Sequence, residues 1–168
     1  MEPQYSDVSA HHVPPTVYPW DISPNVAKMQ ELLRAHGFSV RVDGDYGWRT
    51  EVAVKTFQRQ YGLRVDAIVG AETWSKLMAT VKPGSRPLRS GCSGADVYEL
   101  QGLLQVNGYA VKRTGNFGTE TKSAVQNFQR EHHLRSDGIV DEVTWALLRN
   151  RKPPARQSSL FARRLGRK

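Results

Sequence analysis

Apolar residues recur with helical spacing in the first third of the chain. Val26, Met29, Leu32 and Leu33 lie three or four positions apart, which is typical of a helix that buries one face. The pattern stops at Gly37, and glycine commonly follows a helix because it adopts the left-handed conformation without strain. The spacing therefore predicts a helix that ends just before this glycine.

Signals at the start of this helix and further along the chain predict two more helices. Ser23 and Pro24 supply an N-cap followed by proline at the first helical position. A second helix is expected to start near Thr50, and a third, short helix to present Trp74 and Leu77. The apolar positions of the second helix are Ala53, Val54 and Phe57.

The same pattern occurs twice. Displacing the chain by 71 residues aligns residues 25–77 with 96–148 without a gap, and 22 of the 53 paired positions are identical. Such a period indicates two copies of one structural unit. We therefore predict an all-α fold of two small three-helix modules in tandem, with extended N- and C-terminal arms.

Composition shifts divide the chain around these modules. The predicted parts are an N-terminal arm rich in proline and aromatic residues (1–24), module 1 (25–78), a Pro/Gly linker (79–95), module 2 (96–150) and a basic C-terminal arm (151–168). The prolines of the N-terminal arm favour an extended path. Its Tyr18 and Trp20 are costly to leave in water, so we expect them to pack on module 1 or on a partner.

The ordered motifs of the two copies resemble those of a known family. Both copies contain V-x-x-[ML]-Q-x-L-L, then G-x-[YF]-G-x-x-T, then A-V-x-x-F-Q-R, then D-x-I-V-x-x-x-T-W-x-x-L. This order is similar to that of the peptidoglycan-binding domain 1 family. The resemblance implies a compact three-helix fold that binds the glycan or stem peptide of peptidoglycan, is usually attached to cell-wall hydrolases and performs no catalysis itself.

Each copy departs from the family pattern in one loop. The usual Asp-Gly of the first loop is Thr114-Gly115 in the second copy, and the usual second Asp-Gly is Asp66-Ala67 in the first copy. The resemblance then implies that the two modules differ in affinity or that one has lost the ligand.

Ligand contacts are expected on the first loop and at the start of the second helix. A helix N-terminus presents free N–H groups suited to a carboxylate, and an aromatic ring suits the apolar face of a sugar. The candidates are Asp43, Tyr46 and Arg49 in the first copy and Asn116, Phe117 and Thr121 in the second. Ordinary loop packing and capping is the alternative for these residues. Gln58, Gln129 and the two repeat tryptophans are interpreted as core residues.

The charge of the chain lies mostly at its C-terminal end. The 168 residues carry a formal charge of +8, and residues 151–168 contribute +7 with no acidic residue. The modules themselves are nearly neutral, which disfavours a nucleic-acid protein. We expect the arm to dock on an acidic surface, with a solvated tail as the alternative. Candidate docking residues are Tyr18, Trp20, Leu160, Phe161, Arg163 and Arg164.

Catalytic, metal and cofactor chemistry finds no support in the sequence. The five histidines have no metal-ligand spacing, and Cys92 has no histidine near it in sequence. We therefore expect no enzyme, no cofactor and no metal site. No apolar run is long enough to span a membrane.

The sequence is compatible with several cellular locations and with two functional hypotheses. The N-terminus has no classical export signal, so we expect a cytoplasmic protein, one released by lysis or one carried in a particle, and the cell envelope if peptidoglycan is bound. The first hypothesis is a non-catalytic peptidoglycan-binding protein with two binding modules. The alternative is an adaptor that reuses the fold within a large protein assembly.

Overall fold

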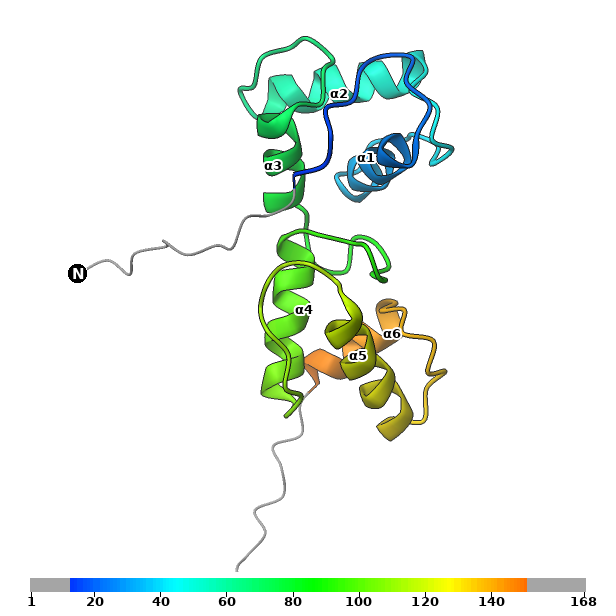
Figure 1. The fold of residues 1–168 in the computed structure, drawn as a ribbon, viewed down its shortest axis with the longest axis vertical. Coiled ribbons are helices and arrows are strands. Elements are labelled where there is room, and N and C mark those ends of the chain that lie inside the picture. Colours follow the sequence, from blue (N-terminus) through cyan, green and yellow to red (C-terminus); the bar gives the residue numbers. More distant parts are fainter. Residues whose placement is uncertain (1–12, 151–168) are drawn as a thin grey trace, which may run out of the picture.

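The structure is a computed structural model, and it describes residues 13–150. Within them the chain forms six helices and isolated β-bridges. The helices are α1 (Pro24–Ala35), α2 (Trp48–Gln60), α3 (Ala71–Ala79), α4 (Ala95–Val106), α5 (Thr119–Glu131) and α6 (Glu142–Arg149). As Figure 1 shows, α1–α3 and α4–α6 form two lobes that follow one another along the long axis. The predicted all-α fold of two tandem three-helix modules is confirmed.

The ends of α1 follow the signals in the sequence. The Ser23 hydroxyl accepts a hydrogen bond from the Val26 N–H at 3.3 Å, and Pro24 occupies the first turn. Gly37 has a φ of +91° directly after the helix, as expected for a left-handed terminus. In contrast, α2 begins at Trp48, two residues earlier than the sequence predicts, because Gly47 takes the N-cap position.

Each module buries its own apolar core. In module 1, Met29, Leu33, Phe57 and Trp74 are fully buried where α1, α2 and α3 meet. The core of module 2 is built in the same way around α4, α5 and α6, with Phe128 and Trp145 in the corresponding places. The helical periodicity thus accounts for both cores.

A short extended strap precedes the first helix of each module. Val17 in the first strap exchanges backbone hydrogen bonds with Val69 at 3.2 and 2.9 Å. Leu88 pairs with Val140 in the same way at 3.0 and 2.8 Å. Val17 and Leu88 are both buried and are separated by the same 71 positions as the rest of the repeat. The structural repeat therefore begins earlier than the sequence repeat.

The segment between the modules packs against module 2. Arg86 donates two hydrogen bonds to the Asp96 carboxylate, from Nε at 2.7 Å and from Nη2 at 3.1 Å, and Nη2 also bonds the Ser93 carbonyl at 2.9 Å. Both charged side chains are almost entirely buried. This bidentate ion pair fixes the segment on the first turn of α4.

Module 1 leaves the two aromatic residues of the segment before α1 largely uncovered. Tyr18 is 52% exposed and Trp20 is 72% exposed, so packing on the module does not bury them, and contact with a partner stays a prediction. The candidate docking residues of the C-terminal arm, Leu160, Phe161, Arg163 and Arg164, lie outside the described residues. Of the helices in residues 13–150, none combines the length and apolar content needed to cross a bilayer.

Candidate functional site

A buried glutamine shapes the first loop of module 1. The Gln30 amide nitrogen donates to the Asp43 carboxylate at 3.0 Å, the Asp45 carbonyl at 2.9 Å and the Thr50 hydroxyl at 3.2 Å. Its amide oxygen accepts the N–H groups of Asp43 and Gly44 at 3.0 and 2.9 Å. One side chain of α1 thus joins the loop to the start of α2. Gln101 does the same in module 2.

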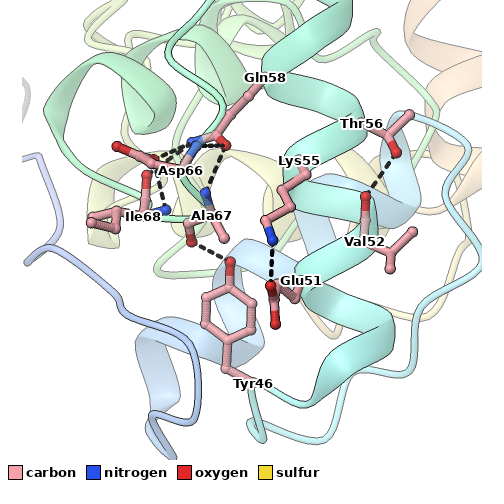
Figure 2. A network of polar contacts seen from close by, with 9 residues as sticks. All are labelled: Tyr46, Glu51, Val52, Lys55, Thr56, Gln58, Asp66, Ala67 and Ile68. Carbon is pink, nitrogen blue, oxygen red and sulfur yellow. Dashed lines mark hydrogen bonds and ion pairs between the residues drawn. The ribbon is translucent and has the colours of Figure 1, made fainter.

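A second glutamine organises the second loop, as Figure 2 shows. The Gln58 side chain accepts from the N–H groups of Asp66 and Ala67 and donates to the Ile68 carbonyl at 3.0 Å. The Tyr46 hydroxyl reaches across to donate to the Ala67 carbonyl. Tyr46 therefore joins the two loops, and the interpretation of Gln58 as a core residue is confirmed.

Three of the predicted ligand residues belong to the interior. Tyr46 and Phe117 are buried in the two cores, and burial raises the pKa of the Tyr46 hydroxyl. Thr121 is also buried, and its hydroxyl accepts a hydrogen bond from Gln101 at 3.0 Å. These side chains hold the loops in place and are not accessible to a ligand. For these three residues, the structure agrees with the alternative from the sequence analysis, which is loop packing and capping.

Asp43 and Arg49 are exposed and line the same small cleft. This cleft has a volume of about 140 Å³, and Trp48 and Arg41 also line it. The backbone N–H of Asp45 and the amide of Gln30 hold the pKa of Asp43 below its usual value, so its carboxylate stays ionised at neutral pH. The structure thus brings together two of the three residues predicted for module 1.

A larger cleft of about 580 Å³ adjoins the first one and contains three arginines. Arg34 comes from α1, Arg41 from the following loop and Arg49 from the first turn of α2. Phe38 and Val42 also line this cleft. Among residues 13–150, none of the three guanidinium groups is in an ion pair. We call the two adjoining clefts the arginine cleft.

Module 2 lacks this concentration of positive charge. The positions 71 residues after Arg34, Arg41 and Arg49 are Gln105, Lys112 and Glu120. Gln105 donates its amide to the Val111 carbonyl at 2.7 Å, and the Glu120 carboxylate accepts the Lys112 N–H at 3.2 Å. The arginine cleft is therefore a property of module 1.

Asn116, the exposed candidate of module 2, lies on a different surface. It lines a cleft of about 470 Å³ between the modules, together with Met78 and Cys92. Its side chain does not join the arginine cleft. Sequence reasoning missed Arg34, Arg41 and Trp48, and a position-by-position comparison of charge and aromatic residues between the two copies could have indicated all three.

Comparison with known proteins identifies the class of these modules. The family model of the peptidoglycan binding domain matches residues 23–77 and 93–148, so the chain belongs to this family. The amidase CwlM of Mycobacterium tuberculosis is 41% identical over 98 residues, which cover 55% of this chain and 24% of CwlM. The amidase CwlL of Bacillus licheniformis is 33% identical over 153 residues, covering 74% of this chain and 42% of CwlL.

Among solved structures, the SleB N-terminal domain is 38% identical with a TM-score of 0.39, and the match covers 40% of this chain and 93% of that domain. The chain spans less than half the length of the curated relatives CwlM and CwlL.

The names of these relatives correct one expectation from the sequence. CwlM and CwlL are named N-acetylmuramoyl-L-alanine amidases, and other relatives are named spore cortex-lytic enzymes. The prediction that this protein is not an enzyme is contradicted by these names. The sequence reasoning considered only catalytic motifs within the chain, whereas the part shared with these enzymes is the binding module.

Proposed function

We propose that this protein binds the peptidoglycan of the bacterial cell wall and that the arginine cleft of module 1 receives carboxylates of its stem peptides. The observation that carries the proposal is the convergence of Arg34, Arg41 and Arg49 on one cleft, with no ion pair to any of them among the described residues. A guanidinium group binds a carboxylate through two parallel hydrogen bonds, and such charge-assisted bonds are stronger than neutral ones.

The site is suited to a ligand of mixed polarity. Phe38 and Val42 give the larger cleft an apolar wall, and the Asp43 carboxylate can accept hydrogen bonds from hydroxyl or amide groups. A stem peptide presents carboxylates, amides and short apolar side chains within a few ångströms. The protein would then act at the cell envelope, where peptidoglycan lies.

Sedimentation with purified sacculi tests the proposal. We expect the double variant Arg41→Gln/Arg49→Gln to bind at least ten-fold more weakly, because each charged hydrogen bond contributes about 1.5–3 kcal/mol. The matched control is Arg64→Gln/Arg135→Gln, which removes the same charge from two side chains that are 87% and 90% exposed outside the cleft. Equal weakening in both variants would assign the effect to net charge alone.

Two further arms define the ligand. Stem peptides with free carboxylates should bind the cleft, and amidated peptides should not, whereas binding of phosphate-bearing wall polymers alone would assign the cleft to a different anion. Recovery of the wild-type chain in the unbound fraction would contradict the proposal and favour the adaptor hypothesis. Release of peptides from the same sacculi measures any amidase activity of the kind that the relatives' names describe.

A further inference from the structure

Three large side chains on one edge of module 1 face solvent. Trp20 is 72% exposed, Ile22 is 78% exposed and Trp48 is 63% exposed. By contrast, Trp74 and Trp145 are buried in the cores. Large exposed apolar residues that gather in one place mark a binding surface more often than scattered ones do.

Backbone pairing brings these residues to the same edge. The Trp20 N–H donates to the Tyr46 carbonyl at 3.0 Å, and the Tyr46 N–H donates to the Asp21 carbonyl at 2.9 Å. Ile22 forms an antiparallel bridge with Asp45. Trp48 follows two residues after Tyr46 and begins α2. The strap in dark blue therefore runs beside the loop that enters α2 (Figure 1).

The backbone conformation of Trp20 is unfavourable for an indole side chain. Its φ is +73°, in the left-handed region that favours glycine. Because the side chain is mostly exposed, little burial offsets this strain. Strain of this kind outside a core suggests a functional use of the side chain.

Module 2 has the same backbone without the aromatic residues. Gly91 stands 71 positions after Trp20, has a φ of +91° and donates its N–H to the Phe117 carbonyl at 3.0 Å. Ser93 and Thr119 correspond to Ile22 and Trp48. The fold of the module thus requires neither tryptophan, and a glycine satisfies the strap geometry.

We propose that Trp20, Ile22 and Trp48 form an aromatic platform on which the amino-sugar glycan strand of peptidoglycan stacks. An exposed indole suits the C–H face of a pyranose ring, because the negative face of an aromatic ring attracts polarised hydrogens. The Arg49 guanidinium lies over the Trp48 ring, 5.3 Å from its centroid, so this indole offers a sugar its remaining exposed surface. Trp48 also lines the arginine cleft beside Asp43 and Arg49, whose side chains can bond sugar hydroxyl and acetamido groups. The glycan would lie on the platform while its stem peptide enters the cleft, so this inference rests on the proposed function.

The platform can be tested with a ligand that carries no peptide. The probe is an uncharged oligosaccharide of N-acetylglucosamine, titrated against the full chain while tryptophan fluorescence is recorded. We expect Trp20→Gly, Trp48→Thr and Ile22→Ser, which place the module 2 residues in module 1, each to weaken binding at least ten-fold. Val65→Ser is the matched control, because it copies Ser136 of module 2 at an exposed position outside the platform.

Sedimentation with sacculi separates this inference from the proposed function. If Trp20→Gly binds the oligosaccharide as well as the wild type, or if the wild type binds sacculi but no oligosaccharide, the platform is wrong and the wall-binding proposal stands. If the wild type binds neither, the proposed function fails. Loss of a protein partner from Trp20→Gly with unchanged oligosaccharide binding would also overturn the platform. Trp20→Gly should retain the wild-type thermal midpoint within about 5 °C. If the thermal midpoint of Trp20→Gly falls further, the oligosaccharide titrations of Ile22→Ser and Trp48→Thr decide the question instead.

Discussion

Four buried glutamines determine the shape of the loops at the residue scale. Gln30, Gln58, Gln101 and Gln129 each lie on a helix and use both amide atoms to bond a loop. Each also reaches a threonine hydroxyl on a following helix. Because an amide supplies both donors and acceptors, one side chain satisfies loop groups that would otherwise be buried without partners.

Removing one of these amides should destabilise its module. Gln30→Ala leaves the N–H groups of Asp43 and Gly44 without their acceptor, and each unsatisfied buried group costs about 1–3 kcal/mol. We expect the free energy of unfolding to fall by about 2–4 kcal/mol in urea denaturation. Gln60→Ala, at an exposed position of α2, is the control and should change it little.

The Asp43 carboxylate provides a second test at this scale. Hydrogen bonds from the Asp45 N–H and the Gln30 amide hold its pKa below the ordinary 3.8. A lowered folded-state pKa stabilises the fold above the unfolded value, and this contribution is lost as the pH falls through the folded pKa. An NMR titration should therefore place the Asp43 midpoint below 3.8, and Gln30→Ala should move it upward. A midpoint at or above 3.8 in the wild type would contradict these bonds.

At the element scale, the helices could be predicted from the sequence but the straps could not. Apolar spacing and the glycines after α1 and α4 identify helices because the side chains themselves carry the pattern. The straps pair through single backbone bridges, as Val17 does with Val69, and such contacts leave almost no sequence signal. The helical pattern therefore does not indicate that the straps before α1 and α4 contribute buried residues to the cores.

The sequence placed some residues of the candidate site correctly on the accessible surface but not others. Asp43 and Arg49 follow from their place at a loop and a helix start, and the structure leaves both accessible. Tyr46, one of the three buried candidates, has the residue type of a sugar platform, but its ring is buried and its hydroxyl donates to the Ala67 carbonyl of the second loop. Residue type alone does not distinguish a buried aromatic ring from an exposed one.

Two arginines of the segment between the modules should differ strongly in their contributions. Arg86→Ala leaves the buried Asp96 carboxylate without its partner, and breaking a buried ion pair costs about 3–5 kcal/mol. Arg89, three residues later, pairs with Glu31 at a more exposed position, so Arg89→Ala should cost about 0–1 kcal/mol. Chemical denaturation of the two variants gives the comparison, and equal losses would refute the distinction.

At the scale of the whole molecule, the two modules share a fold but differ in surface chemistry. The arginine cleft and the exposed tryptophans are in module 1. In module 2, Gln105, Lys112 and Glu120 replace the three arginines, and Gly91 and Thr119 replace the tryptophans. Duplication thus preserved the glutamine-bonded loops in both copies while the surfaces diverged. The Arg89–Glu31 ion pair connects the segment before α4 with α1 of module 1.

The junction between the modules depends on a single glycine. Gly94 has a φ of +145°, and a Cβ there would lie 2.9 Å from the Met78 carbonyl oxygen and 3.0 Å from the Val81 side chain. Both the backbone angle and the close approach exclude a side chain. Gly94→Ala should therefore lower the free energy of unfolding by about 3 kcal/mol, since strain and overpacking each cost about 1–3 kcal/mol. Gly91→Ala, with a φ of +91° but open space around it, is the control and should cost less. Equal losses in the two variants would show that backbone strain alone acts at position 94 and that the approach of the modules contributes nothing.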